Sequence, residues 1–147
     1  MRGGRTWRRA ILLALAGLIV IQLVPVDRDN PPIASTVPAP ADVTAILRRS
    51  CFDCHSNETR WPWYSRIAPI AWVVAHDVHE GRRHANFSEW DRLTENRRQH
   101  TAREIVDVLS KGEMPLPIYL PAHPDARLSD EDRARLETWA RSLATLP

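Results

Sequence analysis

The only two cysteines of the chain stand three positions apart, and a histidine follows at once, in the order Cys51-Phe-Asp-Cys54-His55. This C-x-x-C-H pattern is the attachment signature of a c-type haem. Two thiols at this spacing can form thioethers with two vinyl groups of one porphyrin, and the next residue then lies under the iron. A large cofactor would also stabilise a small domain. The pattern therefore predicts one covalent haem (haem c) on Cys51 and Cys54, with His55 as an iron ligand.

Three other interpretations compete with haem. A disulfide between the cysteines would close a very short loop and would leave His55 without a role. A redox-active dithiol of the thioredoxin type is expected within a βαβ frame, and no strand pattern precedes Cys51. A structural zinc site needs four ligands, and His76 and His79 could complete one with the two thiols. The sequence favours haem and leaves the disulfide and zinc interpretations open.

The charge distribution excludes one class of partner. The chain has 147 residues, enough for one domain, and a formal net charge of +2. Four arginines precede the first acidic residue, Asp27, so the rest of the chain is net acidic. A protein that binds nucleic acid through its phosphates needs a basic face. We therefore expect no nucleic-acid partner.

The N-terminal part predicts a membrane anchor. Residues 10–24, AILLALAGLIVIQLV, are apolar except for Gln22, and arginines precede them. A spanning helix needs about 20 apolar residues, whereas the core of a signal peptide is shorter. We expect residues 1–26 to form an uncleaved transmembrane helix with its arginines in the cytoplasm. The protein would then be a single-pass protein of the bacterial inner membrane, with its C-terminal domain in the periplasm. The competing interpretation is a buried core helix.

A linker and an all-α domain are predicted after the apolar run. Residues 27–41 are rich in proline and lack periodicity, as in an extended tether. Residues 42–147 carry helix signals and no stretch that alternates like a strand, so we expect a helical domain with long loops. The signals for helix ends are Asp42, Pro69, Gly81 and two capping boxes at residues 101–104 and 129–132.

Met114 is the predicted sixth ligand of the iron. It is the only methionine besides Met1, and prolines in Gly-Glu-Met-Pro-Leu-Pro stiffen its loop. A loop methionine that precedes an amphipathic C-terminal helix is typical of small class I cytochromes c. A core-filling role for Met114, or ligation by a histidine instead, stays open. The histidines considered are His76, His79, His84, His100 and His123.

Three further residues are candidates for contact with the haem. Trp61 and Trp63 follow the proximal histidine closely and could pack on the macrocycle, although an ordinary aromatic core uses the same residues. Arg82 could pair with a haem propionate, although a solvated arginine after a helix end would show the same pattern.

Longer stretches of the chain resemble one protein family. They are QLVPVDRDNPP, CFDCHSNETRWPWYSRIAP, HDVHEGRRHANFSEW and GEMPLPIYLPAHPDARLSDEDRARLETWA, which together cover most of residues 22–140. With these motifs the chain resembles the bacterial haem-binding domain family, a cytochrome c-like group of short, membrane-anchored proteins. The resemblance implies one c-type haem on Cys51 and Cys54 with His55 as the proximal ligand. By similarity to cytochromes c it also implies Met114 as the distal ligand, and it implies no substrate.

A single haem is consistent with three functions. An electron-transfer cytochrome would be six-coordinate and would exchange electrons with a redox partner protein or a membrane electron carrier. In a haem-based sensor, a small ligand would displace Met114. A peroxidase would need acid–base groups at an open distal site, which His84 with Arg82 or Arg83 could supply. We expect the electron carrier, a function without catalysis.

Overall fold

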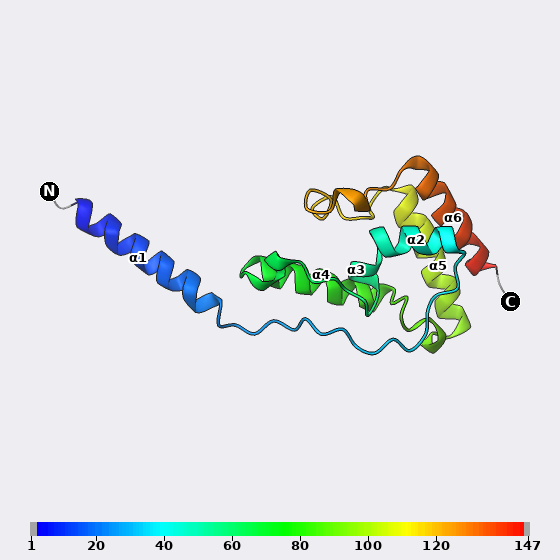
Figure 1. Ribbon diagram of the computed structural model, residues 1–147, viewed down its shortest axis with the longest axis horizontal. Coiled ribbons are helices and arrows are strands. Elements are labelled where there is room, and N and C mark those ends of the chain that lie inside the picture. The colour runs from blue at the N-terminus through cyan, green and yellow to red at the C-terminus, as the bar shows by residue number, and fades with distance from the viewer. Residues whose placement is uncertain (1–2, 146–147) are drawn as a thin grey trace. The chain divides into compact units, whose positions relative to one another are not determined.

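The computed structural model describes residues 3–145 of the chain (Figure 1). These residues form six α-helices and three short 3-10 helices, and they contain no strand. The α-helices are α1 (Gly3–Ile21), α2 (Ala41–Ser50), α3 (Phe52–His55), α4 (Ile70–His84), α5 (Glu95–Ser110) and α6 (Asp130–Ala144). The 3-10 helices are η1 (Trp63–Arg66), η2 (Trp90–Arg92) and η3 (Pro124–Ala126). The prediction of helices without strands is confirmed for this part of the chain.

The N-terminal helix differs from the predicted membrane anchor. α1 has 19 residues, and no helix within residues 3–145 is both long enough and apolar enough to cross a membrane. α1 is not apolar enough because its first turns include Arg5, Arg8 and Arg9. Its apolar part, residues 10–21, would reach only about 18 Å at ~1.5 Å per residue, whereas a hydrocarbon core is about 30 Å thick. The predicted transmembrane helix is wrong, and so is the single-pass inner-membrane location with a periplasmic domain that depended on it.

The chain divides into two compact units. The first contains the residues up to Asp29 together with Trp61–Asp77. The second contains Asn30–Arg60 together with the residues from Val78 onward. All residues of the C-x-x-C-H segment (residues 51–55) belong to the second unit, and so does Met114.

In the first unit, a polar residue of the apolar run has a structural role. The side chain of Gln22 pairs with the backbone of Ala68: Nε2 donates to the carbonyl oxygen at 3.1 Å, and the Ala68 amide donates to Oε1 at 2.9 Å. Arg28 Nη1 donates to the Ser65 carbonyl oxygen at 3.2 Å. These bonds hold the end of α1 and the stretch behind it to the loop before α4.

The second unit is built on α5 and α6, which pack side by side, with α2 against α6 (Figure 1). Leu109 of α5 and Leu136 of α6 are 4% and 1% exposed. Full burial of a leucine side chain stabilises a fold by roughly 1.5–3 kcal/mol. The other buried members of this core are Val37, Val43, Ile46, Leu47, Phe52, Ala85, Phe87, Trp90, Ala102, Trp139, Ala140 and Leu143.

Of the two predicted capping boxes, one is confirmed and one is wrong. At the start of α6, Ser129 Oγ accepts from the Asp132 amide at 3.0 Å, and the Asp132 carboxylate accepts from the Ser129 amide at 3.1 Å. The box at residues 101–104 does not start a helix, because α5 begins earlier with Thr94 as its N-cap. Thr101 is buried inside α5. The first turns of α5 are polar, so hydrophobic periodicity does not reveal them.

Part of the proline-rich stretch before α2 belongs to the core of the second unit. The Ala34 amide donates to the Ser88 carbonyl oxygen at 3.0 Å, and Val37 is 3% exposed. The N-cap of α2 is Pro40 and not Asp42, which lies in the first turn, so that predicted cap is wrong. These contacts fix the stretch that precedes α2, the helix that ends just before Cys51.

Candidate functional site

Cys51, Cys54 and His55 share one side of a single helical turn. α2 ends at Ser50 and α3 begins at Phe52, so Cys51 joins the two helices. The amides of Cys54 and His55 both donate to the Cys51 carbonyl oxygen, at 3.2 and 2.9 Å. Positions i, i+3 and i+4 are neighbours on a helical surface. Two thiols and one imidazole are therefore presented together, and all three residues are partly exposed.

The ring of His55 is held in one tautomer. Its Nδ1 lies 3.1 Å from the carbonyl oxygen of Ala85, the residue that follows α4. A carbonyl oxygen can only accept a hydrogen bond, so Nδ1 carries the proton and Nε2 keeps its lone pair. Burial lowers the pKa of His55, which keeps the imidazole neutral at neutral pH. Histidines that bind metals commonly donate their other ring N–H in this way, so the ring fits an iron ligand.

Gly81 lets α4 approach the C-x-x-C-H segment closely. The sequence predicts that the helix stops at Gly81, but α4 continues to His84, so this prediction is wrong. A β-carbon at position 81 would lie 2.6 Å from the carbonyl oxygen of Cys54 and 3.1 Å from its β-carbon. Both distances are well inside van der Waals contact. The glycine therefore serves the packing of α4 on Cys54, which brings Ala85 within reach of His55.

The two cysteines are thiols rather than a disulfide. Burial, and next the charge of Cys54, raises the pKa of Cys51 to about 12. A redox-active dithiol needs an accessible thiolate with a lowered pKa, which Cys51 does not provide. Within residues 3–145, no group of three or more His, Cys, Asp and Glu side chains could hold a metal ion, so His76 and His79 do not complete a zinc site. The raised pKa of Cys51 disfavours the redox-active dithiol, and attachment of haem to the two cysteines stays a prediction.

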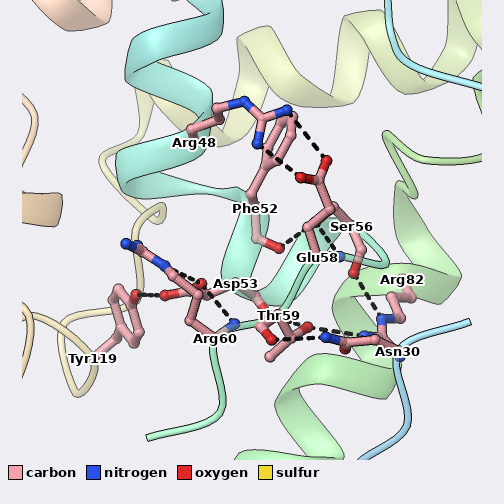
Figure 2. A network of polar contacts seen from close by, with 10 residues as sticks. All are labelled: Asn30, Arg48, Phe52, Asp53, Ser56, Glu58, Thr59, Arg60, Arg82 and Tyr119. Carbon is pink, nitrogen blue, oxygen red and sulfur yellow. Dashed lines mark hydrogen bonds and ion pairs between the residues drawn. The ribbon is translucent and has the colours of Figure 1, made fainter. Parts of the chain in front are cut away.

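Arg82 connects α4 with the residues after the C-x-x-C-H segment (Figure 2). Its Nε donates to the Ser56 carbonyl oxygen at 2.8 Å. Its Nη2 donates to Asn30 Oδ1 at 2.8 Å and to Thr59 Oγ1 at 2.9 Å. These bonds give the arginine a role in the protein itself, and its contact with a haem propionate stays a prediction.

Asp53, the second residue between the cysteines, is a buried carboxylate with donors on both oxygens (Figure 2). Oδ1 accepts from the amide and from Nε of Arg60, at 3.2 and 3.3 Å. Oδ2 accepts from the Tyr119 hydroxyl at 2.8 Å. Tyr119 belongs to the loop between α5 and η3, residues 111–123. This loop, which also carries Met114, is thus held against the C-x-x-C-H segment.

Met114 follows α5 after a Schellman motif. The Gly112 amide donates to the Leu109 carbonyl oxygen at 3.1 Å, and the Glu113 amide donates to the Val108 carbonyl oxygen at 3.0 Å. Gly112 has a φ of 69°, in the left-handed region that favours glycine. Met114 is partly buried. Its coordination of iron stays a prediction.

Trp61 and Trp63 belong to the first unit. Trp63 is 75% exposed and meets the ring of Tyr64 edge-on, with 5.8 Å between the ring centroids. The contact of both tryptophans with haem stays a prediction. Of the histidines considered as iron ligands, His123 stacks on the ring of Tyr119, and the exposed ones are His76, His79, His84 and His100.

Four contributors to the site escape the sequence analysis: the carbonyl group of Ala85, the packing role of Gly81, and the pair Asp53 and Tyr119. Glycine permits close backbone approach because it has no β-carbon, so Gly81 offered a signal for this packing as well as for a helix end. The aspartate between the cysteines offered a weaker signal. Nothing in the sequence indicated which carbonyl group would accept from His55.

A family model decides the relationship of this chain to other proteins. The model described as a haem-binding domain matches residues 16–142, most of the chain. The chain belongs to this haem-binding domain family. The predicted family is thereby confirmed, and membership supports haem as the cofactor. No curated protein and no solved structure matches the chain.

Proposed function

We propose that this haem-binding domain protein is a c-type cytochrome with one haem, held by thioethers from Cys51 and Cys54 and ligated by His55. The observation that carries the proposal is the hydrogen bond from His55 Nδ1 to the Ala85 carbonyl oxygen, on the same turn as the two thiols. It leaves Nε2 as the atom that binds iron. The family match supports the same cofactor. When bound, a haem supplies one-electron redox chemistry.

Electron transfer to a redox partner protein is the activity that we propose for this site. Its second axial ligand would be Met114, and Met/His ligation raises the reduction potential while filling the coordination sphere. A peroxidase would use Arg82 or Arg83 beside His84, but Arg82 donates from Nε and Nη2 to Ser56, Asn30 and Thr59, and Arg83 pairs with Glu80. Because both arginines already have partners within the protein, the structure favours a carrier over an enzyme that needs a distal arginine.

Acid extraction tests the attachment. The wild-type chain, produced in cells with the c-type maturation machinery, should keep its haem on the denatured polypeptide. Cys51→Ser and Cys54→Ser should each leave one thioether and shift the absorption bands of the reduced protein, and the double variant should lose its haem on extraction. If acid removes haem from the wild type, covalent attachment is refuted.

Absorption spectroscopy tests the distal ligand. Met114→Ala should lose the sulfur-to-iron charge-transfer band and become high-spin, because alanine offers no donor to the iron. Leu116→Ala removes an apolar side chain from the same loop and serves as the control, which should keep the band. An unchanged spectrum in Met114→Ala, together with rapid carbon monoxide binding by the reduced wild type, would instead support a haem-based ligand sensor.

A further inference from the structure

The position of Asp53 relative to the two cysteines is well defined. Its backbone belongs to α3, and its carbonyl oxygen accepts from the Thr59 hydroxyl at 2.8 Å. Its side chain is 12% exposed, and Oδ1 accepts two hydrogen bonds from Arg60. Oδ2 therefore points from a fixed place within the C-x-x-C-H segment toward the loop of residues 111–123 (Figure 2).

Tyr119 is equally well held within its own loop. Its ring stacks on that of His123, with 4.0 Å between the centroids and 8° between the planes. Its amide donates to the Leu116 carbonyl oxygen at 2.9 Å, and its hydroxyl donates to Asp53 Oδ2 at 2.8 Å. Burial, and next the bond to Asp53, raises the pKa of Tyr119, so the hydroxyl remains a donor at neutral pH.

Met114 lies between two such fixed points. The Schellman motif holds the chain at Gly112, just before Met114, and the Tyr119 hydroxyl holds it a few residues later. A short loop that is fixed on both sides of a residue samples few conformations. The two contacts therefore limit how far the thioether of Met114 can move from the C-x-x-C-H segment.

We propose that the hydrogen bond between Tyr119 and Asp53 positions the loop of residues 111–123 and keeps Met114 on the iron. This inference rests on the proposed function, in which Met114 is an axial ligand. Asp53 and Tyr119 act through Met114 and are positioning residues. The loop can leave the C-x-x-C-H segment when this bond opens, without the unfolding of α5 or α6, so the bond sets how readily the distal site becomes accessible.

Tyr119→Phe tests the proposal, because it removes the hydroxyl and keeps the stacked ring. Loss of a hydrogen bond to a charged group shifts an opening equilibrium by roughly tenfold. Carbon monoxide can replace Met114 only when the loop is open, so it should bind the reduced variant about tenfold faster than the wild type. The charge-transfer band should weaken, and hydrogen exchange at the amides of position 119 and His123 should accelerate by a similar factor.

A double-mutant cycle separates this bond from general destabilisation. In an Asp53→Ala background, Tyr119→Phe should add nothing, because the acceptor is already gone. Asp53→Leu, which keeps the approximate side-chain shape and also has no acceptor, replaces that variant if it does not fold. Thr138→Val is the matched control, since it removes a hydroxyl that donates to Ala134 at 2.8 Å on α6. It should leave carbon monoxide binding and loop exchange unchanged.

Unchanged carbon monoxide binding and loop exchange in Tyr119→Phe would overturn the proposal, and so would additive effects in the cycle. Failure of the proposed function has a different signature: wild-type haem that acid extracts, or a wild-type spectrum without the charge-transfer band. Even then, hydrogen exchange at the loop amides of Tyr119→Phe decides whether Asp53 holds the loop, because the exchange rate does not depend on which residue ligates the iron.

Discussion

Replacing Gly81 with alanine should separate α4 from the C-x-x-C-H segment. The new β-carbon would lie 2.6 Å from the Cys54 carbonyl oxygen and 3.0 Å from its carbonyl carbon. Both partners are backbone atoms, which cannot rotate away as a flexible side chain can. Ordinary contact begins at 3.4 Å, so α4 and Cys54 would have to move apart by about 0.8 Å.

Two opposing effects set the size of the change. Alanine is a better helix former than glycine by about 1 kcal/mol in a helix interior. Overpacking of a well-packed site costs about 1–3 kcal/mol, and a backbone contact belongs at the upper end of that range. We therefore expect the free energy of unfolding to fall by about 2 kcal/mol in Gly81→Ala.

Gly17→Ala is the matched control, because Gly17 lies within α1 and a β-carbon there meets nothing within 4 Å. It should leave stability unchanged or raise it by up to about 1 kcal/mol. Guanidinium unfolding of the haem-loaded proteins, followed by circular dichroism, measures both variants. The absorption spectrum should also change in Gly81→Ala alone, since the shift pulls Ala85 away from His55. If Gly81→Ala is as stable as Gly17→Ala with an unaltered spectrum, the close packing of α4 on Cys54 is refuted.

Two predictions concern the start of α6. Ser129→Ala removes the acceptor of the capping box and should lower the free energy of unfolding by about 1 kcal/mol in urea titrations, whereas Ser110→Ala at the exposed end of α5 should change it by less than about 0.5 kcal/mol. Equal losses in both would argue against the cap. The Ser129 amide, followed by the hydroxyl of Ser129 and the guanidinium of Arg49, lowers the pKa of Asp132 below its ordinary value of 3.8. The stabilisation by Asp132 is therefore complete above pH 3.8 and is lost as the pH falls through the lower folded-state pKa. In Asp132→Asn, the free energy of unfolding should fall less steeply with decreasing pH in this acid range than in the wild type. An equally steep fall in both proteins would contradict this prediction.

Local signals were predicted well from the sequence. The capping box at Ser129 needs only residues within one turn of α6. The C-x-x-C-H motif places two thiols and an imidazole on one turn by spacing alone. Each of these features depends on neighbours in the chain, so one sequence suffices to predict it.

Errors arose where a local signal had a competing role. The apolar run of α1 suggested a membrane anchor, but the arginines within the same helix leave too little apolar length. Thr101 matched a capping box inside a helix that Thr94 had already begun. Gly81 resembled a helix stop, yet its lack of a β-carbon is used for close packing on Cys54.

The sequence by itself determined the all-helical character of residues 3–145, the cysteine–histidine turn and the family to which the chain belongs. Only the tertiary structure decided that the Ala85 carbonyl oxygen accepts from His55 and that Tyr119 donates to Asp53. These partners stand 30 and 66 residues apart in the chain. No periodicity or spacing in the sequence encodes such pairs. They form only after α4 has packed on the C-x-x-C-H segment and the loop after α5 has brought Tyr119 within hydrogen-bonding distance of Asp53.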